Sequence, residues 1–264
     1  MKQRIITGTI GATGFLLLLY LGGWWYTSLL FVLALLAFVE FAEMKGVGSG
    51  SFPALLGVAL VGMIFAGRLN EAVGFAWSLE TTDLLLAATV ILSLWTVLSR
   101  NRFDVFQATW ILFGALYIGY GFAGMMKTIW EPNGLALSLL VILITWFNDS
   151  GAYFVGRKWG KRKLWPEISP NKTVEGSAAG LVFGLVASLF VFGVFPALGN
   201  WVDALWKGLL IAAAGQLGDL IESAWKRSAG VKDSGSILPG HGGVLDRFDS
   251  LLFTFIVLNL TGLV

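Results

Sequence analysis

The sequence predicts an all-α, polytopic integral membrane protein. Of its 264 residues 56% are hydrophobic, the mean hydropathy is +0.78, and only 13% are charged, whereas soluble domains carry about 25% charged residues. Its apolar runs are long enough to cross a bilayer, which takes roughly 17 to 25 residues of helix. We therefore expect one integral membrane domain over residues 1–264, with N-terminal spans in 1–130 and the more polar spans and loops in 134–264.

About nine transmembrane helices are expected in chain order. They cover approximately 5–21, 24–42, 52–67, 82–98, 106–126, 134–155, 174–198, 204–225 and 250–264. The third run is short and the fourth has no sharp start, so the boundaries of these two are the least defined. A second apolar run follows the first almost at once, which favours a membrane span over a cleaved signal peptide for the first run.

The distribution of basic residues predicts the orientation. With nine spans, the N-terminus and the loops after spans 2, 4, 6 and 8 share one side of the membrane. That side carries all of the 18 Lys and Arg residues except Arg68, Lys127 and Lys207. Because basic loops stay in the cytoplasm, we expect a cytoplasmic N-terminus, a location in the cell membrane, and two polar cytoplasmic loops at 156–173 and 226–249.

The stretch Ser223–Asp249 carries the strongest functional signal. It holds seven charged residues, five glycines and the only histidine of the chain, His241, between two apolar segments. Charged groups at a membrane border are costly unless they bind something charged. Its basic side chains can bind phosphate, its carboxylates can bind a metal, and its glycines let a ligand approach the backbone closely. This combination points to phosphate chemistry at the membrane surface. The chain has no cysteine, which excludes disulfides, thiolate metal sites and cysteine nucleophiles.

The eighth span has a polar face. Gln216, Asp219, Glu222 and Lys226 follow one another at spacings of three, three and four residues, which places them on one side of a helix. One interpretation is a packing face with an internal Glu222–Lys226 pair. The other is a functional carboxylate at Asp219, because an unpaired carboxylate within a span is expensive.

The sequence DRFD contains the next pair of carboxylates. Asp246 and Asp249 share a face if this segment is helical, although acidic residues also suit a helix N-terminus in general. Together with Asp219 they predict an all-oxygen site, and such ligands suit Mg²⁺ or Mn²⁺. A second, monovalent cation such as K⁺ is compatible with several carboxylates.

Other polar residues predict contacts with anionic substrates. Gly242 and Gly243 around His241 suit an anion cradle with His241 as a substrate contact, although a simple turn fits the same pattern. Ser169, Lys172 and Thr173 precede the seventh span, where hydroxyls, amides and an ammonium group bind phosphate well.

The end of the sixth span is ambiguous. Asn148 and Asp149 lie where this span reaches the cytoplasm. Asp149 could cap the helix, form an ion pair with a basic residue of the following loop, or contribute to the polar site. The basic run that follows suits anionic lipid headgroups, although it also fits simple topology determination. This run comprises Arg157, Lys158, Lys161, Arg162 and Lys163.

Taken together these residues resemble the phosphatidate cytidylyltransferase (CDP-diacylglycerol synthase) family. The family signature has the form S-x-x-K-R-x4-K-D, followed by H-G-G-x-x-D-R-x-D. This chain supplies Ser223, Lys226, Arg227, Lys232, Asp233, Gly235, Pro239, His241, Gly242, Gly243, Asp246, Arg247 and Asp249. The upstream segments NDSGAYFVGR and SPNKTVEG are also similar to family motifs, with Asn171 where many relatives have lysine. The resemblance is strong over roughly 145–250.

The resemblance implies the reaction of CTP with phosphatidate to give CDP-diacylglycerol and pyrophosphate in phospholipid biosynthesis. It implies Asp219, Asp246 and Lys226 as catalytic residues, with Asp219, Asp246 and Asp249 as metal ligands. The expected phosphate-binding residues are Asn148, Asp149, Ser169, Lys172, Thr173, Arg227, Lys232, His241, Gly242, Gly243 and Arg247. The expected partners are CTP, phosphatidate and the bilayer, with no nucleic acid; a homodimer is compatible with the sequence.

Rival functions remain open from the sequence. A CTP-dependent polyprenol kinase or an archaeal-lipid cytidylyltransferase would share much of the chemistry but differ in the acceptor or the phosphorus attacked. An ion-coupled transporter would also use buried carboxylates such as Asp219 and Glu222. Against a transporter, the polar residues gather on one membrane side and no repeated half is visible. A CDP-alcohol phosphotransferase is disfavoured because DRFD has the wrong spacing for its signature.

Overall fold

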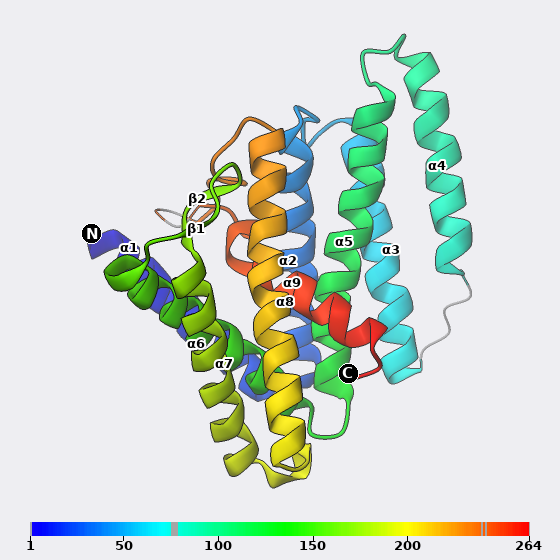
Figure 1. Cartoon of the computed structure of the whole chain (residues 1–264). Coiled ribbons are helices and arrows are strands. Elements are labelled where there is room, and N and C mark those ends of the chain that lie inside the picture. Colours follow the sequence, from blue (N-terminus) through cyan, green and yellow to red (C-terminus); the bar gives the residue numbers. More distant parts are fainter. Residues whose placement is uncertain (1, 75–78, 239, 241, 264) are drawn as a thin grey trace. The chain divides into compact units, whose positions relative to one another are not determined.

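The computed structural model describes residues 2–74, 79–238, 240 and 242–263, and these residues are mostly α-helical (Figure 1). They form two compact units. The first comprises Met1–Trp130 and Val231–Arg247, and the second comprises Glu131–Gly230 and Phe248–Val264. The helices confirm the all-α class, and the expectation of a single membrane domain stays a prediction.

Five helices make up most of the described part of the first unit. They are α1 (Lys2–Leu21), α2 (Gly23–Met44), α3 (Phe52–Val73), α4 (Thr81–Leu98) and α5 (Val105–Trp130). The bounds of α3 have a clear local cause. The Ser51 hydroxyl accepts a hydrogen bond from the Ala54 N–H at 3.4 Å, and the helix ends at Gly74 in the left-handed region, with φ of 73°, which glycine adopts without a steric penalty.

Close packing of α2, α3 and α5 depends on glycine. A Cβ atom at Gly57 of α3 would collide with Phe38 of α2, and one at Gly114 of α5 would collide with Phe41. Phe41 also stacks on Trp110 of α5 with ring centroids 4.2 Å apart, and Trp110 donates a hydrogen bond to the Phe41 carbonyl oxygen. Figure 1 shows α4 beside α3 and α5, away from α2. The three glycine-packed helices therefore form the core of this unit.

The second unit combines helices with a small hairpin. Its elements are α6 (Gly134–Trp159), β1 (Lys163–Trp165), β2 (Ser169–Thr173), α7 (Val174–Val194), the short 3-10 helix η1 (Pro196–Leu198), α8 (Trp201–Ser228) and most of α9 (Leu245–Leu260). Asn200 caps α8 by accepting hydrogen bonds from the N–H groups of Val202 and Asp203. Asp203 in turn accepts from the Asn200 N–H, which completes a capping box.

Glycines also bring α7 close to its neighbours. Gly176, Gly180 and Gly184 recur every four residues, so they lie on one face of α7. A Cβ atom at Gly180 would lie 2.6 Å from Asn148 Oδ1 of α6 and 2.8 Å from Gln216 Nε2 of α8. Small residues on such a face allow membrane helices to pack backbone to backbone. The close approach of α6, α7 and α8 therefore requires these glycines.

The predicted spans correspond to the observed helices in order. Among the described residues, the seven helices α2 to α8 are long and apolar enough to cross a membrane, while α1 has a shorter apolar part, Thr7–Leu21. Helix α9 has 16 residues. The chain is therefore a multi-pass membrane protein. Several boundaries differ by four or more residues. Helix α3 continues to Val73 instead of ending near 67, and α7 stops at Val194 because Pro196 cannot continue the helix. Helices α5 and α6 each end four residues later than predicted, and α9 begins at 245 instead of 250 and ends at 260.

The largest local difference from the sequence-based expectation lies in the segment 156–173. It was expected to be a polar loop, but α6 continues to Trp159, and β1 pairs with β2 in an antiparallel hairpin. The register joins Lys163 to Thr173 and Trp165 to Ser169. The strands are too short to show a clear alternation of apolar and polar residues, which is the signal that predicts a strand.

Replacing Gly180 with alanine should loosen the packing of α7 against α6 and α8. The added methyl group would meet Asn148 and Gln216 at distances below 3 Å, and we expect a loss of about 1–3 kcal/mol. Thermal unfolding in detergent measures this loss. Gly193→Ala in the same helix is the matched control, because its Cβ would lie 3.8 Å from Trp201. Equal stability of the two variants would contradict the packing argument.

Candidate active site

The polar face predicted for α8 exists in the second unit, and each of its carboxylates has a basic partner. The Asp219 Oδ2 atom lies 2.6 Å from the Lys172 Nζ atom of β2. Glu222 Oε2 lies 3.2 Å from Lys226 Nζ, one turn further along the helix. The packing interpretation of Glu222 and Lys226 is therefore confirmed as an ion pair, and Asp219 is held by a residue from the predicted phosphate-binding segment.

The Lys172–Asp219 pair lies near the surface of the second unit. The two side chains are 28% and 32% exposed, and the Ser223 hydroxyl donates a hydrogen bond to Asp219 Oδ1 at 3.3 Å. Lys172 comes from the hairpin, which is further joined to α8 by a hydrogen bond from Arg227 Nε to the Ile168 carbonyl oxygen. The hairpin therefore brings an ammonium group to a carboxylate that α8 presents.

Helix α9 adds a further carboxyl group next to this pair. Asp249 lies within hydrogen-bonding reach of Glu222 and close enough to Asp219 and Lys226 to interact with both electrostatically. Gly218 permits this approach, since a Cβ there would lie 2.7 Å from the Asp249 carbonyl oxygen. Two adjacent carboxyl groups repel each other unless they share a proton or a cation, so this arrangement requires one of the two.

Asp149 of α6 extends the acidic cluster. It lies close enough to Asp219, Asp249 and Lys172 for electrostatic interaction with each of them. The cluster thus contains four carboxyl groups (Asp149, Asp219, Glu222 and Asp249) and two ammonium groups (Lys172 and Lys226). An excess of carboxylates between apolar helices is costly, and a divalent cation would balance it.

The donor set matches a hard divalent cation, although it is not assembled as a metal site. Among the described residues, no group of three or more acidic or histidine side chains is arranged to hold a metal ion as it stands. The carboxylate oxygens of Asp219 and Asp249 are the ligand type that Mg²⁺ prefers. One of these oxygens, Oδ2 of Asp219, contacts the Lys172 ammonium group in this structure.

Two of the predicted substrate ligands have structural partners. Asn148 is fully buried, and its Oδ1 atom accepts a hydrogen bond from Gln216 Nε2 at 2.8 Å. Gln216 also exchanges hydrogen bonds with Ser177 of α7. The Thr173 hydroxyl caps α7 by accepting from the Gly176 N–H at 3.2 Å. Asn148 thus links α6 to α8 and Thr173 caps α7, and the predicted contacts of both residues with substrate stay predictions.

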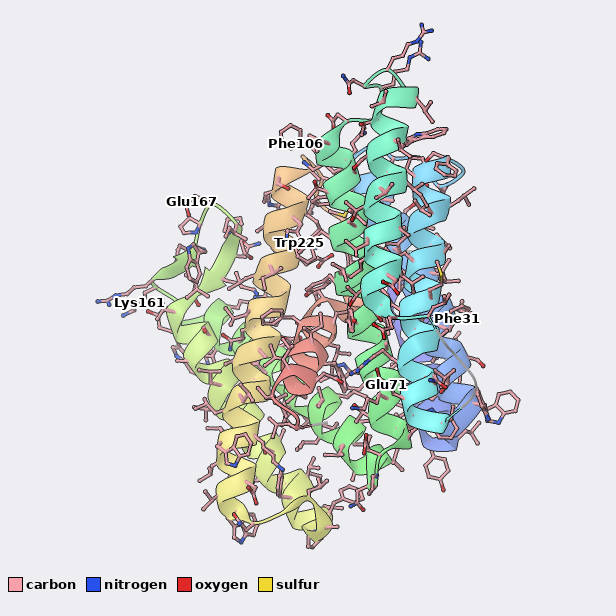
Figure 2. All side chains as sticks on the ribbon, turned by 90° about the vertical axis from the view of Figure 1, so that its right-hand side faces the viewer. Phe31, Glu71, Phe106, Lys161, Glu167 and Trp225 are labelled. Carbon is pink, nitrogen blue, oxygen red and sulfur yellow. The ribbon has the colours of Figure 1, made fainter. Side chains whose placement is uncertain are left out.

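The hairpin presents the basic run without burying it. Glu175 fixes its start, because the Glu175 carboxylate accepts hydrogen bonds from the backbone N–H groups of Lys161 and Arg162. Figure 2 shows Lys161 and Glu167 projecting outward from this part of the ribbon. Ser169 begins β2 and pairs with Trp165. The exposed basic side chains suit contact with anionic headgroups.

The remaining predicted residues belong to the first unit. Asp246 Oδ2 accepts hydrogen bonds from the Ser234 N–H at 2.9 Å, the Ser234 hydroxyl at 3.0 Å and the Gly243 N–H at 2.8 Å. Gly242 has φ of 83°, in the left-handed region. Lys232 and Arg247 are exposed. His241 lies outside the described residues, so its substrate contact stays a prediction.

Glu40 of α2 was not among the predicted residues; its carboxylate accepts hydrogen bonds from the N–H groups of Val244 and Leu245 where α9 begins. A signal for it exists in the sequence. Glu40 is a carboxylate within an apolar run, and such residues mark polar contacts in the protein interior. Its partner could not be inferred, because the contact joins residues about 200 positions apart.

Comparison with known proteins identifies the family. A sequence model described as "Cytidylyltransferase family" matches residues 2–263. The chain belongs to the cytidylyltransferase family. Among its relatives, the phosphatidate cytidylyltransferase of Bacillus subtilis (strain 168) is 42% identical over 256 residues, which cover 96% of this chain and 94% of the relative. The family resemblance seen in the sequence motifs is thereby confirmed.

Two staphylococcal relatives support the same assignment. The phosphatidate cytidylyltransferase of Staphylococcus saprophyticus is 40% identical over 264 residues, and that of Staphylococcus aureus (strain COL) is 41% identical over 261 residues. Each alignment covers 98% of both chains. The similarity therefore extends over the N-terminal spans of this cytidylyltransferase, which the sequence motifs alone did not cover.

Substitution of Lys172 by methionine tests the charge balance of the acidic cluster. Loss of the ammonium group removes one of the two positive charges described in this cluster of four carboxyl groups. We expect the thermal midpoint without divalent cations to fall by about 2–4 °C, equivalent to about 1 kcal/mol, and to recover in Mg²⁺. Lys163→Met, on the exposed strand β1, is the control. A fall of the same size in both variants, or no recovery in Mg²⁺, would contradict the proposed balance.

Proposed function

We propose that this cytidylyltransferase makes CDP-diacylglycerol and pyrophosphate from CTP and phosphatidate. Its relatives from Bacillus subtilis and two staphylococci, which align over nearly the whole chain, are named phosphatidate cytidylyltransferases. The structural observation that carries the proposal is the cluster of carboxyl and ammonium groups on α6, α8, α9 and the hairpin. Such a cluster supplies both a cation site and phosphate ligands within a membrane protein.

The reaction requires two anions to meet. A phosphatidate phosphate oxygen forms a bond to the α-phosphorus of CTP, the bond from that phosphorus to the α–β bridging oxygen breaks, and pyrophosphate leaves with the electron pair. A phosphate monoester has a second pKa near 6, so it is already largely ionised at neutral pH. The protein need not supply a strong general base, and catalysis consists mainly of positioning and charge neutralisation.

In this proposal Asp219 and Asp249 hold Mg²⁺ or Mn²⁺, with Asp246 as a third ligand one turn before Asp249 in α9. A bound Mg²⁺ ion supplies charge neutralisation on the triphosphate and on the departing pyrophosphate. A second, monovalent cation such as K⁺ would fit the remaining carboxyl groups. The support for this ligand set is its oxygen chemistry and its sequence spacing.

Lys172 has two anionic partners available in this scheme. Without substrate its ammonium group lies 2.6 Å from Asp219. With a cation held by Asp219, Lys172 would be free to bind a phosphate of CTP. Lys226, Arg227, Lys232 and Arg247 are the other cations proposed for the phosphates of CTP or lipid, and Ser169 completes the phosphate ligands from the hairpin.

The site is proposed to face the cytoplasm. The basic residues of the hairpin segment and of the stretch 226–249 support this orientation under the positive-inside rule. CTP is a cytoplasmic nucleotide, so the same orientation gives the site access to its soluble substrate. The exposed residues Arg157, Lys158, Lys161, Arg162 and Lys163 would then contact anionic headgroups of the inner leaflet.

A product assay tests the proposed reaction. The purified chain is incubated in detergent with CTP and phosphatidate, with and without Mg²⁺, and the lipids are separated by mass spectrometry. We expect CDP-diacylglycerol and pyrophosphate in equal amounts, only with the divalent cation. A phosphorylated lipid together with CDP would instead indicate a lipid kinase. Ion flux into proteoliposomes without CTP, and no lipid product, would indicate a transporter.

Asp219→Asn should abolish most of this turnover. The amide keeps the size of the side chain but removes the charge that holds a cation, and we expect a loss of roughly 100-fold or more. Glu167→Gln, an exposed carboxylate in the hairpin of the same unit, is the control and should retain activity. Near-normal, Mg²⁺-dependent turnover by Asp219→Asn would exclude Asp219 as a metal ligand.

A further inference from the structure

Glu40 is a buried carboxylate near the C-terminal end of α2. Its side chain is 2% exposed, and a buried carboxylate is costly unless hydrogen bonds or a positive charge compensate it. Its Oε1 atom accepts a hydrogen bond from the Val244 N–H at 2.9 Å, and Oε2 accepts from the Leu245 N–H at 3.0 Å. Both oxygens are therefore used to hold the chain that enters α9.

These two N–H groups need an acceptor from elsewhere. The first N–H groups of an α-helix have no partner within the helix, and a Ser, Thr, Asp or Asn side chain at the start usually accepts from one of them. Helix α9 begins at Leu245, so its N-cap residue is Val244, whose apolar side chain cannot accept a hydrogen bond. Glu40 supplies the missing acceptor from another helix, and its negative charge also suits the positive end of the α9 dipole.

Two glycines make room for this contact. A Cβ atom at Gly235 would lie 2.7 Å from Glu40 Oε1, and one at Gly243 would collide with both Glu40 and Ser234. Gly243 was predicted from the sequence as part of an anion cradle. The structure shows that its lack of a side chain also admits the Glu40 carboxylate, which fixes the path of the backbone at this point.

Ser234 connects Glu40 to Asp246. The Ser234 hydroxyl lies 3.0 Å from Asp246 Oδ2 and 3.5 Å from Glu40 Oε2. Because a hydroxyl has one proton, it donates mainly to the nearer oxygen, that of Asp246. The N–H groups of Ser234 and Gly243 bond to the same Asp246 oxygen. The segment that Glu40 holds is thus the segment that orients the Asp246 carboxylate.

We propose that Glu40 is a positioning residue for cytidylyl transfer. It holds Ser234, Val244 and Leu245 in place and thereby orients the Asp246 carboxylate, without touching the substrate itself. This inference rests on the proposed function, because it gives Asp246 a task in that reaction. Displacement of a reacting group by about 1 Å can cost a factor of about 100 in rate, so a change at Glu40 should affect turnover more than substrate binding.

The test compares Glu40→Gln with Glu43→Gln. In Glu40→Gln the remaining oxygen still accepts a hydrogen bond. The new amide NH₂ group faces the other backbone N–H, and because both groups are donors, that hydrogen bond is lost. Glu43 lies three residues along the same helix and is exposed, so Glu43→Gln removes an equal charge without affecting the contact. We expect Glu40→Gln to lower kcat by about tenfold or more, with the KM for phosphatidate changed less than twofold, and Glu43→Gln to match the unaltered chain.

Hydrogen exchange supplies a readout that does not depend on activity. The amides of Val244 and Leu245 should exchange at least tenfold faster in Glu40→Gln than in Glu43→Gln, while amides in α5 keep their rates. Ser234→Ala, which leaves both of these bonds to Glu40 in place, should lower kcat without the change at Val244 and Leu245. It therefore tests the link to Asp246 even where Glu40→Gln folds poorly.

Three outcomes separate the two proposals. Faster exchange with unchanged kcat in Glu40→Gln would overturn the positioning role and leave the proposed function intact. A kcat that falls only in proportion to the folded fraction would also overturn it. The absence of CDP-diacylglycerol from the unaltered chain would contradict the proposed function itself, while the exchange result would still report on the contact.

Discussion

The need to compensate carboxylates between apolar helices governs both polar regions of this protein. An ionised carboxylate cannot remain without partners in a low-dielectric environment. The two units meet this requirement differently. In the first, Glu40 is compensated by backbone N–H groups at the start of α9. In the second, Asp219 and Glu222 are paired with Lys172 and Lys226.

These two forms of compensation suit different tasks. Backbone N–H groups are fixed by the fold, so the Glu40 contact can act as a rigid support. A lysine side chain is flexible and hydrated, and it can leave a partly exposed carboxylate at little cost. The Lys172–Asp219 pair is therefore suited to a site whose occupant changes during a reaction, and the fully buried Glu222 is suited to a permanent ion pair.

The close approach of backbone segments places these groups. Gly180 admits the amide groups of Asn148 and Gln216 between α6, α7 and α8, and Gly218 admits Asp249 and Ser250 of α9 against α8. Neither contact would survive a side chain at the glycine. Turns therefore explain only some of the 34 glycines of the sequence. Several others lie within helices. There they lower the stability of the helix itself but allow neighbouring helices to pack closely.

Local patterns in the sequence predicted much of this organisation. Hydropathy located the helices, and the spacing of Asp219, Glu222 and Lys226 predicted their common face, because a helix repeats every 3.6 residues. The Glu40 contact with α9 could not be predicted, since it joins distant parts of the chain and leaves no periodic signal. The β1–β2 hairpin was missed because its strands are short. The capping of α7 by Thr173 was not predicted, because a hydroxyl near a helix start suits a cap and a phosphate ligand equally well; its contact with phosphate stays a prediction.

The most direct test of the central claim is the affinity of the purified chain for Mn²⁺, measured by the EPR signal of the free ion with and without CTP. We predict that the chain together with CTP binds more Mn²⁺ than the chain and CTP bind separately. We also predict that Asp219→Asn weakens the Mn²⁺ affinity measured with CTP at least tenfold, while Glu167→Gln leaves this affinity unchanged. Equal Mn²⁺ affinity in the unaltered chain and in Asp219→Asn, with CTP present, would contradict a cation site in the acidic cluster.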